Sequence, residues 1–135
     1  MSPAIARLNP STLPNAAELG YSQISIVEPG RLAFVSGQVA TRPGGAPVPD
    51  DVAEQMKLSA RNARAALEAV GACFADVVMA RIYMVNLTPD RLEALMPEFL
   101  AAFDGVQPSL TGVGVAALAT PELQVEIELA VRLPD

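Results

Sequence analysis

The sequence contains no histidine, no tryptophan and a single cysteine, Cys73. The absence of histidine excludes Ser-His and Cys-His catalytic pairs, and it removes the usual nitrogen ligand of transition metals. One cysteine without histidine makes no zinc site and no disulfide within the chain. We therefore expect no metal and no cofactor, and a reducing compartment.

Basic residues and long apolar runs are also scarce. Nine Lys and Arg stand against fifteen Asp and Glu, which gives a net charge of -6. An acidic protein repels phosphate backbones and anionic head groups, so the composition argues against nucleic-acid and membrane partners. Polar residues interrupt each apolar run before bilayer-spanning length, and the first ten residues lack the apolar core of a signal peptide. These features predict a cytoplasmic protein.

What the chain does have is material for one hydrophobic core. Its 135 residues are 51% apolar, enough for one core and too few for two, so we expect a single domain over 1–135. After an irregular, proline-containing arm over 1–20, two β-branched-rich runs at 23–27 and 32–39 flank a turn sequence and predict a β-hairpin. A loop rich in proline and glycine follows at 41–50.

Two segments show the apolar periodicity of helices. The first, 52–70, follows Asp50 and Asp51, either of which can cap it, and stops at a glycine. The second, 89–103, follows the cap Thr88. Pro97 conflicts with this second helix, because an internal proline removes a backbone donor and should kink the helix or shift its start.

The order of elements predicts the fold class. Further strands at 77–85, 110–118 and 124–133 give two strands, a helix, a strand, a helix and two strands. Right-handed crossovers place both helices on one face of a mixed sheet, which is an α+β fold. Both faces of the 77–85 strand are apolar, so the second face needs a cover. Further copies of the chain are the simplest cover, and an arm lying over the sheet of a monomer is the alternative.

Five short segments resemble the reactive-intermediate deaminase (Rid, or YjgF) family. They are GYSQ at 20–23, FVSGQ at 34–38, DVV at 76–78, PSLT at 108–111 and VEIE at 125–128. The resemblance implies a chorismate-mutase-like α+β fold and a homotrimer whose sheets form a central barrel, with three ligand clefts at subunit interfaces. It also implies hydrolysis of reactive enamines and imines to keto acids and ammonia, with no cofactor.

One position departs from the family pattern. Where family members carry an arginine that binds the substrate carboxylate, this chain has Leu110, which can neither neutralise nor hydrogen-bond an anion. Leu110, Gly112 and Gly114 alternate along one strand and share a face, so the cleft wall that they form is apolar and leaves more room than the family pattern would. The asparagine that family members carry on the second helix is also missing, since Glu93 or Ala94 falls there. We expect the cleft to accept a larger, less anionic or uncharged ligand.

Other family cleft positions are retained. By resemblance Glu126 is the catalytic residue that positions water, and Tyr21, Ser36, Gly37 and Thr111 line the cleft together with Leu110 and Gly112. Each also has a structural interpretation: Glu126 can belong to a polar sheet face, Tyr21 can pack at a strand start, and Ser36-Gly37 can form a bulge. Thr111 points away from Leu110 in a regular strand, so its backbone amide is the contributing group.

Two arginines on neighbouring strands are candidates for the missing positive charge. Arg81 and Arg132 can supply it, but such arginines more often pair with carboxylates such as Glu126 or Glu128 in a subunit interface.

Cys73 has the character of a small packing residue.

The sequence thus supports two functions. The first is an imine or enamine deaminase-type hydrolase, favoured by Glu126, and the second is a non-catalytic small-molecule-binding or regulatory trimer, favoured by Leu110. The endoribonuclease activity for which some family members are named is disfavoured by the acidic charge and the lack of histidine. A chaperone-like role has no specific sequence feature.

Overall fold

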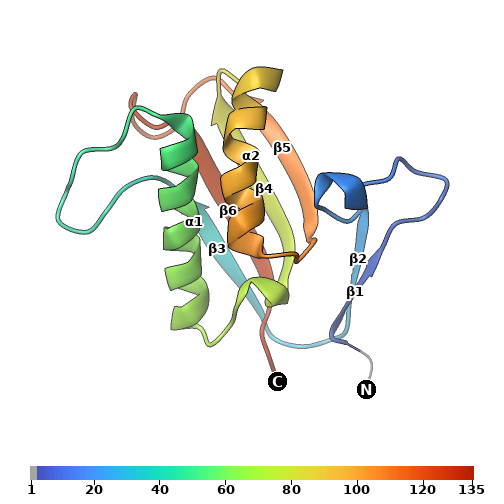
Figure 1. Ribbon diagram of the computed structural model, residues 1–135. Coiled ribbons are helices and arrows are strands. Elements are labelled where there is room, and N and C mark those ends of the chain that lie inside the picture. Colours follow the sequence, from blue (N-terminus) through green and yellow to red (C-terminus); the bar gives the residue numbers. More distant parts are fainter. Residues whose placement is uncertain (1–2) are drawn as a thin grey trace.

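The computed structural model describes residues 3–135 and contains a four-stranded mixed sheet with two helices on one face (Figure 1). The sheet has the order β3-β6-β4-β5. Its strands are β3 (Leu32–Gln38), β4 (Val77–Val85), β5 (Ser109–Val115) and β6 (Val125–Arg132). β6 runs antiparallel to both of its neighbours, and β4 and β5 are parallel. The expected α+β class is therefore confirmed.

Local sequence signals set the ends of both helices. Helix α1 (Val52–Ala69) begins where the Asp51 side chain accepts a hydrogen bond from the Glu54 N–H, and it ends just before Gly71, which has a φ of 71°. Helix α2 (Pro89–Phe103) begins where the Thr88 hydroxyl accepts from the Arg91 N–H. A short helix, η2 (Phe74–Asp76), connects α1 to β4.

Pro97 lies inside α2 without ending it or moving its start. The start of the helix is therefore not shifted, and the other expected effect, a kink at Pro97, stays a prediction. Pro97 is exposed, so its ring projects outward and the helix loses only the one hydrogen bond that a proline cannot donate.

The predicted hairpin is also wrong. β2 (Ile24–Val27) pairs antiparallel with β1 (Ile5–Leu8) in a separate two-stranded sheet, whereas β3 pairs with β6. The arm that we expected to be irregular thus contains a strand, and it also contains the short helix η1 (Ala17–Leu19). Strand-forming sequences specify extended backbone but leave the partner open, and here each run finds a partner distant in sequence.

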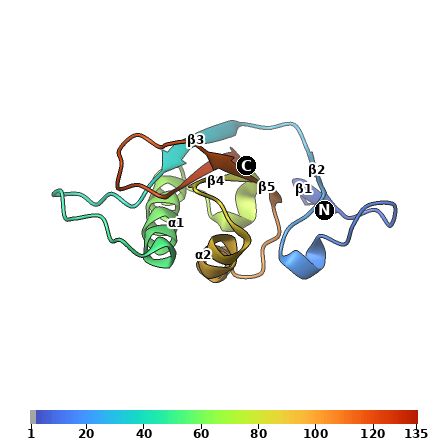
Figure 2. The ribbon, with the colours of Figure 1, turned by 90° about the horizontal axis from the view of Figure 1, so that it is seen from above.

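The core lies between the helices and one face of the sheet. Val125, Ile127 and Leu129 of β6 and Ala80 and Ile82 of β4 are buried there against α1 and α2. The opposite face is left bare in Figure 2, where both helices lie on one side of the strands. Phe34, next to this open face at the edge strand β3, is 77% exposed. Within residues 3–135, no helix has both the length and the hydropathy needed to cross a bilayer.

Candidate functional site

A cavity of about 620 Å³ lies between α2, β5 and η1. Three of the predicted ligand-binding residues line it: Tyr21, Leu110 and Gly112. The volume is within the range of small-molecule sites, about 300 to 1,000 Å³. Its other walls are mostly apolar, with Leu92, Met96 and Leu100 of α2 among them. We refer to it as the α2 cavity.

Strand register explains why Leu110 and Gly112 face the helices. Leu110 lies beside Ala80 and Gly112 beside Ile82 in the parallel β4–β5 pair, and both β4 residues are buried under the helices. Neighbouring residues of paired strands share a face, so Leu110 and Gly112 also point toward α2. A Cβ placed on Gly112 would meet no atom within 4 Å, so the wall is open at this position, as the sequence predicted.

The N-terminal arm closes the cavity on its other side. The Ser22 N–H donates to the Pro108 carbonyl at 3.0 Å and its hydroxyl donates to the Gln107 carbonyl at 2.6 Å, which fixes the arm against the start of β5. Gly20 lies directly against the Leu100 side chain and has a φ of 89°, a conformation that favours glycine. These contacts place Tyr21 in the cavity wall.

A second group of predicted residues lies at the other edge of the sheet. Ser36 and Gly37 form a bulge in β3, because both fall between Val35, which pairs with Leu129, and Gln38, which pairs with Ile127. The Glu126 side chain lies directly against Gly37, at a distance that would exclude a Cβ. The structural interpretation of Ser36-Gly37 as a bulge is therefore confirmed, and its role in ligand binding stays a prediction.

The open face of the sheet carries a polar cluster next to this group. Arg81 donates to Glu128 Oε1 at 2.9 Å, and the Tyr83 hydroxyl donates to the same oxygen at 3.1 Å. Partial burial, and then the hydrogen bond to Glu128, raise the pKa of the Tyr83 phenol. Thr111 lies beside Arg81 in the β4–β5 register, so it too is on the open face, as predicted from its alternation with Leu110.

The predicted site residues thus fall into two separate groups. Leu110 and Gly112 lie on the helix-covered face at the β5 edge, whereas Glu126 lies on the open face beside β3, at the opposite edge. Along β6, Val125 and Ile127 are buried in the core, so Glu126 between them points away from the helices. A single copy of the chain therefore cannot bring Glu126 to Leu110.

Neither candidate arginine lies in the wall of the α2 cavity. Arg81 pairs with Glu128 on the open face, as expected for a structural arginine. Arg132 does not pair with Glu126 or Glu128 as the sequence suggested. It is 4% exposed, it contacts the exposed carboxylate of Asp135, and it donates to the Pro29 and Leu133 carbonyls, because β6 ends where the chain enters β3. No residue lining the α2 cavity is basic.

The sequence missed part of the cavity wall. Leu92 and Met96 share the apolar helical period with the fully buried Leu95 and Phe99, so the period alone does not distinguish the two pairs. The structure separates them, since Leu92 and Met96 are only half-buried and line the α2 cavity. Glu93 is in the cavity wall as well, on the helix where family members carry an asparagine. The signal available in the sequence was the offset of one residue between Met96, which lines the cavity, and Leu95, which is buried in the core.

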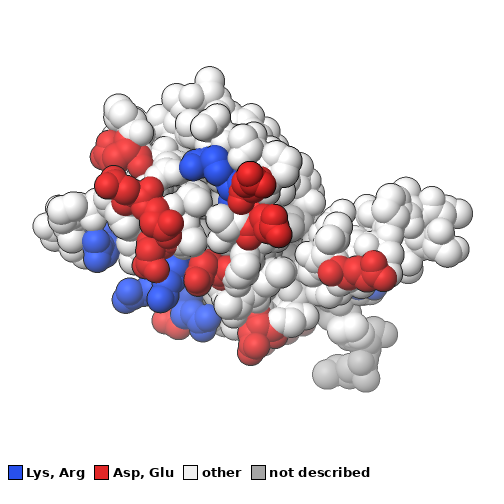
Figure 3. All heavy atoms as spheres, turned by 45° about the horizontal axis from the view of Figure 1, so that its top comes forward, with Lys and Arg blue, Asp and Glu red and all other residues white. Residues whose placement is uncertain are grey.

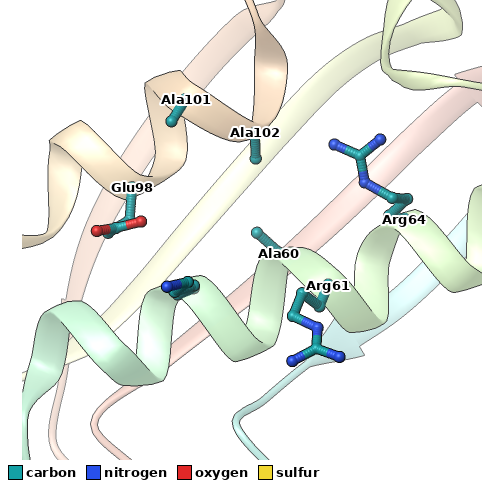
Figure 4. A pocket seen from close by; sticks show the side chains of 7 residues that line it. Ala60, Arg61, Arg64, Glu98, Ala101 and Ala102 are labelled. Carbon is teal, nitrogen blue, oxygen red and sulfur yellow. The ribbon is translucent and has the colours of Figure 1, made fainter.

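A smaller cavity between α1 and α2 collects basic side chains. It measures about 220 Å³ and is lined by Lys57, Arg61 and Arg64 of α1 and Glu98 of α2, among others. In Figure 4 the guanidinium groups of Arg61 and Arg64 point in different directions and do not converge on one point. Figure 3 shows separate groups of acidic side chains, with a few basic groups between them, on a face that is otherwise uncharged. This arrangement does not form the basic stripe that nucleic-acid binding requires.

Metal ligands do not gather anywhere in the part of the chain that the structure describes: no three Asp, Glu or Cys side chains lie close enough to hold an ion.

Cys73 is exposed, so the prediction of a packing role for it is wrong. It precedes the short helix η2, where its backbone N–H donates to Asp76 Oδ2, and this position at a helix start keeps its side chain at the surface.

Known proteins are similar to this chain in both sequence and fold. The family described as Endoribonuclease L-PSP matches residues 12–133. RutC family protein YjgH of Escherichia coli K12 is 33% identical over 120 residues, which cover 88% of this chain and 87% of that protein. The 2-iminobutanoate/2-iminopropanoate deaminase of the same organism is 32% identical over 108 residues, covering 78% and 84% of the two chains.

Structural similarity extends over nearly the whole chain. The Rid-family protein YyfB of Yersinia pestis has a TM-score of 0.91 and 34% identity, and the match covers 96% of this chain and 99% of that one. Together with the sequence matches, this establishes that the chain belongs to the Rid/YjgF family, which is also described as Endoribonuclease L-PSP.

Proposed function

We propose that this chain, folded as a single domain, works as a homotrimer with ligand clefts at its subunit interfaces. Each cleft combines the α2 cavity of one copy with the Glu126 group of a neighbour. The observation that carries the proposal is the separation of Glu126 and Leu110 onto opposite faces and edges of the sheet. Phe34, exposed on the β3 edge beside Ser36 and Gly37, supplies apolar surface that a neighbouring copy would bury.

The chemistry that this cleft supports best is hydrolysis of a small imine or enamine. Water adds across the C=N bond, the C–N bond then breaks, and a carbonyl compound and ammonia leave. Glu126 accepts hydrogen bonds from the attacking water and orients it. Backbone amides at the Gly37 bulge and at Thr111 stabilise charge that develops on oxygen, and Tyr21 orients the ligand.

Leu110 favours a second candidate, a trimer that binds small carbonyl or imine metabolites without converting them. Carboxylate-bearing substrates such as 2-iminopropanoate need a cationic anchor, and the α2 cavity has none among its lining residues. The proposal therefore concerns imines that lack a carboxylate more than those derived from amino acids.

Ammonia release from 2-iminopropanoate and from a bulkier aromatic imine, both generated in situ, tests the proposal. We expect the wild type to prefer the aromatic imine, Glu126→Ala to abolish turnover, and Glu128→Ala, the matched control two residues away, to retain it. Leu110→Arg should shift the preference toward 2-iminopropanoate. Activity appearing only in Leu110→Arg would establish the binding function instead. Light scattering should give three times the chain mass of 14.1 kDa, and a monomer would contradict the shared cleft.

A further inference from the structure

The α2 cavity offers hydrogen-bond acceptors and negative charge but no positive charge. Glu18 of η1 and Glu93 of α2 stand in its walls, and all the other lining residues are apolar except Tyr21. Both glutamates are exposed, so their carboxylates lie where a ligand would enter. Their field raises the local concentration of cations and lowers that of anions.

The remaining walls accept an apolar body. Leu92, Met96, Leu100 and Leu110 form an apolar surface across α2 and β5, and the open space at Gly112 extends it. Tyr21 brings an aromatic ring, whose face attracts cations, into the same cavity. An apolar surface bordered by carboxylates and an aromatic ring is complementary to a molecule with a hydrocarbon body and one ammonium or iminium group.

We propose that the ligand of the α2 cavity is an apolar organic cation, that is, the ammonium or iminium form of an amine-derived molecule without a carboxylate. This inference rests on the proposed function for the site, and it names the class of substrate: imines of apolar amines and aldehydes in place of imines of amino acids. Glu18 and Glu93 determine the charge preference, and Leu110 accommodates the hydrocarbon part.

Three probes with one skeleton test the charge preference: 3-phenylpropylamine, 3-phenylpropanol and 3-phenylpropanoate, each titrated into the full-length protein by calorimetry near neutral pH. We expect the amine to bind about tenfold or more tightly than the carboxylate, since two nearby exposed carboxylates attract one and repel the other. The preference should weaken as the salt concentration rises.

Variants identify the groups responsible. The double variant Glu18→Gln, Glu93→Gln should bring the amine and the carboxylate to similar affinities. Glu98→Gln, the matched control, removes a carboxylate of the same helix that faces the α1 side, and it should keep the preference (Figure 4). Leu110→Arg should invert it. Equal binding of the three probes by the wild type, stronger binding of the carboxylate, or no binding of any probe would overturn the proposal.

The outcome for turnover is separate from the outcome for binding. Tight amine binding without ammonia release from any imine would uphold the ligand class and refute the deaminase function. Hydrolysis of 2-iminopropanoate at least as fast as that of an apolar aldimine, together with weak amine binding, would uphold the deaminase function and refute the ligand class.

Discussion

Replacing Gly37 by alanine tests whether the β3 bulge holds Glu126 in its position. A Cβ on Gly37 would lie 2.6 Å from Glu126 Cγ and closer still to its carboxyl group. Carbon atoms in contact are ordinarily about 3.5 to 4.0 Å apart, so the glutamate side chain has to move by about 1 Å. A displacement of about 1 Å in a group that orients a reactant can lower turnover about 100-fold.

The same substitution should change stability little. The clashing atoms belong to a flexible, half-buried side chain that can swing aside, and alanine restricts the unfolded backbone more than glycine, by roughly 0.5 kcal/mol. We therefore expect the free energy of unfolding to change by about 1 kcal/mol or less. Urea unfolding and ammonia release, measured at one protein concentration, separate the two effects.

Gly112→Ala is the matched control, because a Cβ at that position meets no atom within 4 Å. We expect it to leave the Glu126 carboxylate in place, with a similarly small change in stability. A crystal structure of each variant shows the carboxylate directly, whether or not the protein turns over an imine. The reasoning would be refuted if Gly37→Ala left the carboxylate unmoved, or if it retained wild-type turnover with the carboxylate displaced.

Three further predictions follow from buried or coupled polar groups. Arg132→Leu leaves three carbonyl acceptors without their buried donor and should lower the free energy of unfolding by about 3 kcal/mol, against roughly 0.5 kcal/mol for the exposed Arg42→Leu. Similar urea midpoints for the two variants would contradict this. Gln55→Leu removes a fully buried amide that bonds three backbone groups and should cost about 2 to 4 kcal/mol, with faster hydrogen exchange in the 122–124 segment as the second measurement. Because the folded protein raises the pKa of Tyr83, the stabilising contribution of its neutral phenol is present below pH 10.0 and is lost as the pH rises through the folded pKa. An NMR titration of the Tyr83 ring should show a lower midpoint in Glu128→Gln than in the wild type. An unchanged midpoint would exclude the hydrogen bond to Glu128 as a cause of the raised pKa.

The ends of the helices were predictable from sequence because they depend on residues within one turn. Asp51 and Thr88 accept from backbone N–H groups three residues ahead, and a glycine follows the end of α1. The order of strands and helices then predicted both helices on one face, and the motifs predicted the family. Strand partners were not predictable, since β2 and β3 are adjacent in sequence yet belong to different sheets.

The sequence by itself determined the α+β class, and it predicted the composition-based exclusions and the departure from the family pattern at Leu110. These depend on residue identity, periodicity and local capping, which are properties of short segments. Only the tertiary structure decided that Glu126 and Leu110 lie on opposite faces at opposite edges of the sheet, and that Glu18, Glu93 and Pro97 meet in one cavity wall. These positions depend on strand register, on the sheet order and on how the N-terminal arm docks against β5, which are set by contacts between residues far apart in the chain.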